Sequence, residues 1–316
     1  MTQAPSRRGA RSSSRSRRNA RDIHAPRASF EELEIHTSDG VSLRAVVDDP
    51  PEGTPLAGTC VLAHAMFARK SEFGKRDAPG LSHAIAKAGF RTIAFDFRGH
   101  GDSKPLSPGE WGYDDLVRLD LPAVTECARA RGEGKPVVVL GHSLGGHVAL
   151  AAQGTGAMDV DAIVAVAANV WLRELEPSRV RWAAKLAVAR ASLEVVERIG
   201  RVPARRLRLG SDDESVRYMR DLLRAPLEDR WCSADGATNY LASLSNVTIP
   251  VAAVVSRAER LNCHHESGAR LAERCAGRVE VTRVDRVGHM QLVTTPAAHR
   301  EILAALAWSL RDQTRP

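Results

Sequence analysis

Residues 137–150 read VVVLGHSLGGHVAL, an apolar run that meets a glycine-flanked serine and continues into a helical pattern. The apolar run predicts a buried strand, and the residues after the serine predict a helix. Ser143 therefore stands at a strand-to-helix corner and matches G-x-S-x-G, the pattern of a nucleophile elbow. Glycines at positions 141 and 145 would let neighbouring segments pass without a Cβ clash. The alternative is that Ser143 only caps the helix in a glycine-rich turn.

The rest of the chain predicts an α/β fold around this corner. Two alternating runs separated by Asp39-Gly40 predict a hairpin, and continuous β-branched runs between helical patterns predict a parallel sheet covered on both faces. We expect a mostly parallel central sheet of about eight strands. The predicted strands lie in residues 30–38, 41–49, 58–65, 91–101, 136–141, 161–169, 249–256 and 278–289. The predicted helices lie in residues 80–89, 113–131, 144–154, 264–277 and 295–310.

Residues 171–245 interrupt this rhythm and contain only helical patterns. We therefore predict a core formed by residues 29–170 and 246–316, with residues 171–245 inserted as a helical cap, or lid, over the sheet edge. One apolar stripe in the insertion is either ordinary core or a substrate channel. Its members are Trp182, Leu186, Leu193, Val196 and Ile199.

The chain has 316 residues, with 43% hydrophobic and 26% charged residues, which is typical of a folded globular protein. No stretch approaches the ~18 apolar residues of a membrane span. Residues 1–28 hold eight arginines and one acidic residue, so they carry the whole net charge of +7. We expect this Arg/Ser-rich tail to be disordered; it could bind an anionic polymer or lipid, whereas the neutral body is not expected to bind nucleic acid.

Cysteine and histidine patterns give no sign of a disulfide framework or a metal site. The five scattered cysteines favour reduced thiols and a cytoplasmic location. Residues 262–266, NCHHE, lack the i, i+4 spacing of helical zinc motifs, so we expect no metal there. No G-x-G-x-x-G or Walker pattern is present, and no cofactor is expected.

A serine nucleophile needs a base and an acid that orients it. His289 follows the last predicted strand and is the candidate base. Glu259, in the loop after strand 249–256, is the preferred acid. Asp285 is the rival but lies within the predicted strand before His289, and Glu174 is a third choice. Oxyanion donors are expected from the backbone N–H groups of the residue after the nucleophile, Leu144, and of Met66.

Four stretches in order resemble the α/β-hydrolase fold superfamily over about residues 30–312. They are VLAHAMFARKSEF (61–73), FDFRGHGDS (95–103), GHSLGG (141–146) and VGHMQLV (287–293). The resemblance is to the monoacylglycerol-lipase-like or serine-aminopeptidase-like group. Two departures stand out, because the family's His-Gly reads His64-Ala65 and its usual acidic aspartate is Glu259. The added Cβ at Ala65 could crowd the oxyanion loop, and glutamate is one methylene longer than aspartate.

The resemblance and the residues predict a carboxylesterase-like or lipase-like serine hydrolase acting on a small-molecule acyl substrate. An acyltransferase or a carbon–carbon bond hydrolase could use the same triad. A protein of another class, a non-catalytic binding or regulatory protein on the same fold, is the remaining alternative. The sequence does not define the oligomeric state.

Overall fold

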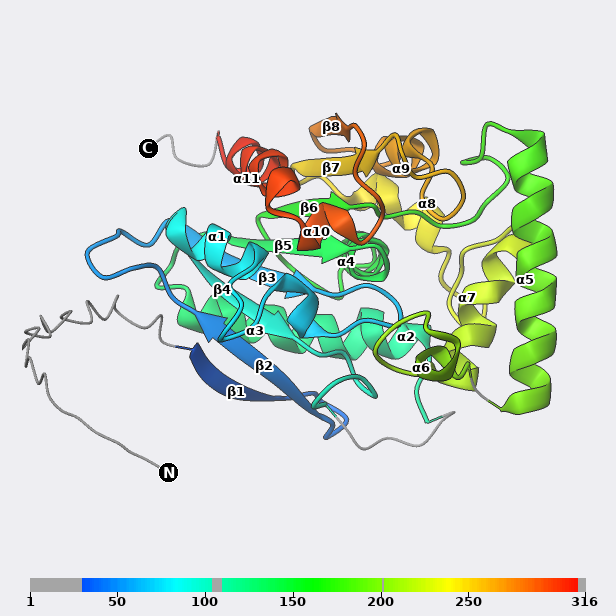
Figure 1. The fold of residues 1–316 in the computed structure, drawn as a ribbon, viewed down its shortest axis with the longest axis horizontal. Helices are drawn as coiled ribbons and strands as arrows, with labels where there is room; N and C mark the ends of the chain where they lie inside the picture. The colour runs from blue at the N-terminus through cyan, green and yellow to red at the C-terminus, as the bar shows by residue number, and fades with distance from the viewer. Residues whose placement is uncertain (1–29, 104–109, 201, 312–316) are drawn as a thin grey trace, which may run out of the picture.

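A single eight-stranded sheet forms the centre of the molecule (Figure 1). The computed structural model describes residues 30–103, 110–200 and 202–311; the predicted tail lies outside them. The sheet order is β1-β2-β4-β3-β5-β6-β7-β8. The strands are β1 (Phe30–His36), β2 (Ser42–Asp48), β3 (Gly58–Ala63), β4 (Phe90–Phe95), β5 (Val137–His142), β6 (Ala162–Val166), β7 (Val251–Ser256) and β8 (Val279–Val284).

Only β2 runs against its neighbours. It pairs antiparallel with both β1 and β4, and every other neighbouring pair in the sheet is parallel. The prediction of a mostly parallel sheet of about eight strands is therefore confirmed. In such a sheet the carboxyl ends of the parallel strands share one edge, where functional loops gather. The loops after β3, β4, β5, β7 and β8 all begin at that edge.

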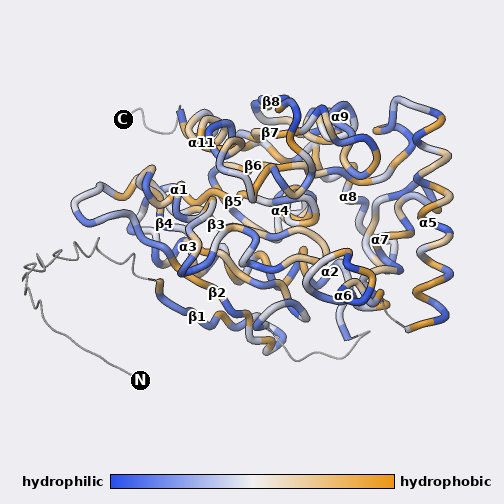
Figure 2. The backbone as a smooth tube through the Cα atoms, viewed as in Figure 1, coloured by the Kyte–Doolittle hydropathy of each residue, from blue (hydrophilic) through white to orange (hydrophobic). Residues whose placement is uncertain are grey.

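Helices cover both faces of the sheet, and each face has its own apolar core. Successive residues of a strand point into different cores. In β3, Val61 and Ala63 belong to the first core, whereas Cys60 and Leu62 belong to the second core. Figure 2 shows hydrophobic residues concentrated along the central strands. The first core takes helical residues from α3 (Leu121–Arg131), α4 (Leu144–Gly154) and α9 (His265–Ala272), and it continues into the segment between β6 and β7 through residues such as Ala189 and Tyr218. The second core takes helical residues from α1 (Leu81–Lys87), α10 (Gln291–Thr294) and α11 (Pro296–Ser309). Shorter elements are η1 (Lys70–Phe73), α2 (Tyr113–Asp115), η2 (Leu116–Asp120) and η3 (Leu244–Asn246).

The segment between β6 and β7 is helical. Its elements are α5 (Arg179–Ile199), α6 (Ala204–Leu207), α7 (Val216–Glu228) and α8 (Tyr240–Ser243). In the described part of this segment, extended pairing is limited to two isolated bridges. A fully buried ion pair, Lys185 Nζ to Glu176 Oε2 at 2.8 Å, anchors α5 to the chain before it.

The stripe predicted on α5 is only partly buried. Val196 is buried and Leu193 half-buried, but Ile199 is 55% exposed. At 100° per residue, Ile199 lies 60° around the helix from Val196, away from the packed side. The prediction of one common face is therefore wrong for Ile199.

Candidate active site

The corner at Ser143 has the strained backbone that the sequence pattern predicts. Ser143 has φ 52° and ψ −106°, a left-handed φ that a serine adopts only when its surroundings impose it. Its N–H donates to the Val166 carbonyl at 2.8 Å, which holds the corner against β6. A Cβ at Gly145 would lie 2.1 Å from the Ala63 carbonyl oxygen, so this position requires glycine. Ser143 remains partly exposed, while its neighbours His142 and Leu144 are buried.

His289 and Glu259 come together from two separate loops. His289 Nδ1 lies 3.5 Å from Glu259 Oε2, which is a charge-pair contact longer than a hydrogen bond. The other Glu259 oxygen, Oε1, accepts the N–H groups of Leu261 and Asn262, each at 3.2 Å. These two bonds orient the carboxylate within its own loop.

The His289 ring lies beside the residue that precedes the serine. The ring centroids of His289 and His142 are 5.1 Å apart with the planes tilted by 37°. No hydrogen bond joins the Ser143 hydroxyl to His289, as judged over the part of the chain that the structure describes. Such a bond is often long or misaligned without substrate and tightens when substrate binds. The structure therefore brings the imidazole and the carboxylate together beside His142, the residue that precedes Ser143.

Neither rival acid faces the imidazole. The Asp285 side chain is 67% exposed and lies 3.5 Å from Arg257. Glu174 is also exposed and pairs with Arg274. Both carboxylates are therefore occupied at the surface, and Glu259 is the one beside His289.

The electrostatic surroundings of His289 favour its neutral form. Burial, with a further contribution from nearby His142, lowers its pKa from 6.5 to about 4. Glu259 and Glu72 act in the opposite direction, because a nearby carboxylate favours imidazolium. Near neutral pH the imidazole can therefore accept a proton.

The predicted oxyanion amides lie on segments fixed by their neighbours. The Ala65 N–H donates to Glu72 Oε1 at 3.0 Å, and the Gly145 N–H donates to the His64 carbonyl at 3.2 Å. Met66 follows Ala65 and Leu144 precedes Gly145. The N–H groups of Met66 and Leu144 have no acceptor in the described chain. Both amides are thus available to a ligand oxygen.

Glu72 is a member of this site that no sequence pattern indicated. It lies in η1, and its side chain is only 5% exposed. One oxygen contacts both the Ala65 N–H and His142 Nδ1, at 3.0 and 3.1 Å. The other, Oε2, is buried and has no partner among the described residues. Within KSEF a glutamate resembles any surface residue, so only tertiary structure shows that it joins the oxyanion loop to the elbow.

The stretch FDFRGHGDS has a structural role at the end of β4 and in the loop after it. Arg98 is buried and bridges Asp39 and Asp120. A Cβ at Gly101 would lie 2.1 Å from an Asp96 oxygen, so the loop packs closely around that carboxylate. His100 Nε2 contacts Glu214 Oε1 at 3.2 Å, which ties this loop to the inserted segment.

The described residues show no cluster of three or more His, Cys, Asp or Glu side chains arranged for a metal ion. In the NCHHE stretch, His264 instead caps α9, since its Nδ1 accepts the Glu266 N–H at 3.3 Å. Nor is any helix of the described chain long and apolar enough to cross a membrane.

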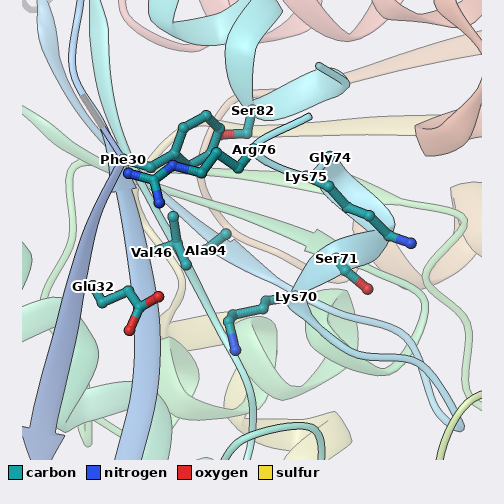
Figure 3. A pocket seen from close by; sticks show the side chains of 10 residues that line it. All are labelled: Phe30, Glu32, Val46, Lys70, Ser71, Gly74, Lys75, Arg76, Ser82 and Ala94. Carbon is teal, nitrogen blue, oxygen red and sulfur yellow. The ribbon is translucent and has the colours of Figure 1, made fainter. Parts of the chain in front are cut away.

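A small cavity of about 180 Å³ lies near η1 but outside this site (Figure 3). Its walls include the Phe30 ring, the Lys70 and Arg76 side chains and the Ser82 hydroxyl. None of its lining residues is a predicted site residue, so we do not assign it to the acyl group.

A family model described as serine aminopeptidase, S33, matches residues 58–294, three quarters of the chain. The chain belongs to this S33 family. The match includes the elbow and both loops that carry Glu259 and His289, and it makes the protein an α/β hydrolase.

Solved structures agree on the fold. Est1E from Butyrivibrio proteoclasticus, solved with ferulic acid, has a TM-score of 0.61 at 14% identity, covering 90% of this chain and 100% of its own. A monoacylglycerol lipase from Paleococcus ferrophilus has a TM-score of 0.56 at 17% identity, covering 90% and 99%. The esterase Pf2001 from Pyrococcus furiosus has a TM-score of 0.55 at 18% identity, covering 90% of each chain. A search of curated proteins finds no significant sequence match.

Proposed function

We propose that this S33-family hydrolase cleaves carboxylic esters through an acyl-enzyme formed on Ser143. The observation that carries the proposal is the strained, partly exposed Ser143, with the His289–Glu259 pair against the preceding His142 ring and two amides without acceptors on the adjoining segments. This combination fits nucleophilic catalysis better than a helix cap, which requires no base. A merely structural serine would also give no reason to strain the backbone.

Each group has one role in the proposed reaction. Ser143 Oγ attacks the acyl carbon while His289 Nε2 takes the hydroxyl proton, and the carbonyl oxygen becomes an oxyanion bound by the Met66 and Leu144 N–H groups. The imidazolium, stabilised by Glu259, then protonates the leaving alkoxide, and an acyl-serine remains. Water attacks this ester with His289 as base, and release of the acid restores Ser143.

We also propose that residues 171–245 act as a lid over this site. The Phe67 N–H donates to Glu214 Oε1 at 2.7 Å, and the Phe67 carbonyl accepts the Ser211 N–H at 2.6 Å. Phe67 follows Met66 directly and has a left-handed φ of 62°. The inserted segment therefore contacts the loop that carries an oxyanion donor, which is the place from which it could control substrate access.

A panel of p-nitrophenyl esters of increasing chain length tests the proposal. Because the family model is described as a serine aminopeptidase, the panel should include aminoacyl p-nitroanilides as amide substrates. We expect ester turnover that Ser143→Ala abolishes, while Ser245→Ala, a change at an exposed serine, leaves it intact. Unchanged turnover in Ser143→Ala would refute the nucleophile, and turnover of anilides alone would refute the ester class.

A further inference from the structure

Positive charge is concentrated in one part of the inserted segment. Residues 179–210, which include α5 and α6, contain nine arginine or lysine residues and two glutamates. Lys185 is buried and pairs with Glu176, and Arg181 pairs with the same carboxylate, so the surface charge is carried by the other arginines. Since residues 29–316 are neutral as a whole, the rest of that body carries −7. This segregation is a property of the folded body and is separate from the arginine-rich tail.

Exposed apolar side chains are concentrated in the same place. Among the described residues, seven large hydrophobic side chains are exposed, and six of them lie between positions 180 and 209. They are Val180, Val188, Val195, Ile199, Leu207 and Leu209, and their exposed fractions run from 40% to 81%. Isolated exposed hydrophobic residues are common, but six within thirty residues are a local concentration of exposed apolar surface, which indicates an interaction surface.

Helix α5 has a second apolar stripe on its outward side. At 100° per residue, seven exposed apolar residues fall within about 120° of one another, on the side opposite buried Ala189 and Val196. The members of the stripe are Val180, Ala184, Ala187, Val188, Ala191, Val195 and Ile199. Figure 1 shows α5 at the outer edge of the molecule, with α7 between it and the sheet. The inner stripe packs on the protein, and the outer stripe faces solvent.

Helix α6 and the residues that follow it combine charge and apolar surface most closely. Residues 205–210, RRLRLG, are all exposed. Leu207 and Leu209 are 55% and 57% exposed, and they alternate with Arg206 and Arg208. Over the described chain, no carboxylate lies within ion-pair distance of either arginine. These charges are therefore available to an external partner.

We propose that the outer surface of residues 179–210, called here the α5–α6 face, binds an anionic lipid surface. Arginines beside aliphatic side chains suit a bilayer interface, where phosphates bind the charges and acyl chains receive the aliphatic groups. A second copy of the chain would bring one arginine-rich face against another, which opposes a symmetric dimer through this surface. Nucleic acid would satisfy the arginines but leave the six aliphatic side chains exposed.

Co-sedimentation of the full-length protein with phosphatidylserine–phosphatidylcholine vesicles tests the proposal. Three double variants are compared with wild type: Arg206→Gln/Arg208→Gln, Leu207→Ala/Leu209→Ala, and the control Arg44→Gln/Arg300→Gln. The control removes the same net charge from exposed arginines outside the face. All these side chains are exposed, so the variants should fold, which circular dichroism would verify. The tail is present in every variant and contributes equally.

We expect wild type to bind the anionic vesicles, to release them at high salt, and to bind pure phosphatidylcholine weakly. Each arginine near an anionic surface strengthens binding about fivefold, so the arginine pair should weaken partitioning by about 25-fold. The leucine pair should weaken it by about tenfold or more. The control should stay within about twofold of wild type, because Arg44 lies on β2 and Arg300 on α11, outside the face. Ser143→Ala should bind as wild type, because lipid binding does not depend on catalysis.

Several outcomes would overturn the proposal. If the control variant and the Arg206→Gln/Arg208→Gln variant lost vesicle binding to the same extent, binding would depend on net charge or on the tail. If the Leu207→Ala/Leu209→Ala variant bound vesicles as tightly as wild type, the face would recognise a polyanion rather than a lipid surface. A dimer that the leucine pair dissociates, seen by analytical ultracentrifugation, would assign the face to a second copy. Absence of vesicle binding by wild type would refute it directly.

Discussion

Titration of His289 should set the acid limb of the pH–activity profile. Burial and the neighbouring His142 lower the pKa of His289 from 6.5 to about 4. In the proposed reaction the neutral imidazole removes the Ser143 proton, so activity requires a pH above this pKa. Activity should therefore persist as pH falls through 6 and decline only near pH 4.

The same shift has a consequence for stability. A lowered pKa in the folded state means that the unfolded chain binds the proton more tightly, so acid favours unfolding. The free energy of unfolding should lose about 1.4 kcal/mol per pH unit between 6.5 and about 4, about 3 kcal/mol in all. Above pH 6.5 this contribution to stability is fully present.

The assay is kcat/KM for a neutral p-nitrophenyl ester, followed at the isosbestic wavelength of p-nitrophenol. Tryptophan fluorescence at each pH would show that the protein is folded, which separates titration of the base from acid unfolding. An acid limb near pH 6.5 in folded protein would refute the reasoning, because it would mean that burial does not disfavour the imidazolium.

Four further substitutions test the surroundings of the base and the corner at Ser143. Glu259→Gln should lower kcat on the order of 10⁴-fold and move the acid limb to lower pH, whereas Asp285→Asn should match wild type; equal effects in steady-state kinetics would contradict the choice of acid. Glu72→Gln should lower kcat/KM by up to about 100-fold with little change in the fold seen by circular dichroism, and wild-type kinetics would remove Glu72 from the site. Gly145→Ala should lower the free energy of unfolding by about 3 kcal/mol in urea titrations, because its Cβ meets backbone; wild-type stability would contradict the close approach.

Local patterns predicted the sheet and the corner well. Val137–His142 is a buried strand and Leu144–Gly154 a helix because apolar runs and glycine positions act over a few residues. Strand-end loops also predicted that Ser143, His289 and Glu259 would share one edge, since parallel strands bring their carboxyl ends together.

Features that depend on distances between loops could not be predicted in the same way. Sequence position favoured Glu259 over Asp285 without excluding Asp285. Only the folded loops show that Asp285 lies at the surface and that Glu259 lies beside His289. Glu72 gave no signal, because its role depends on reaching both Ala65 and His142. The outward position of Ile199 depends on which side of α5 packs against α7, which periodicity does not decide.

The most direct measurement is labelling of the purified full-length protein with a fluorophosphonate probe, followed by mass spectrometry of the modified peptide. The probe forms a stable bond with a serine only when a base activates it. We predict a single label on Ser143, lost in Ser143→Ala and strongly reduced in His289→Ala. Label on another residue, or equal labelling of wild type and His289→Ala, would contradict an activated Ser143–His289 pair.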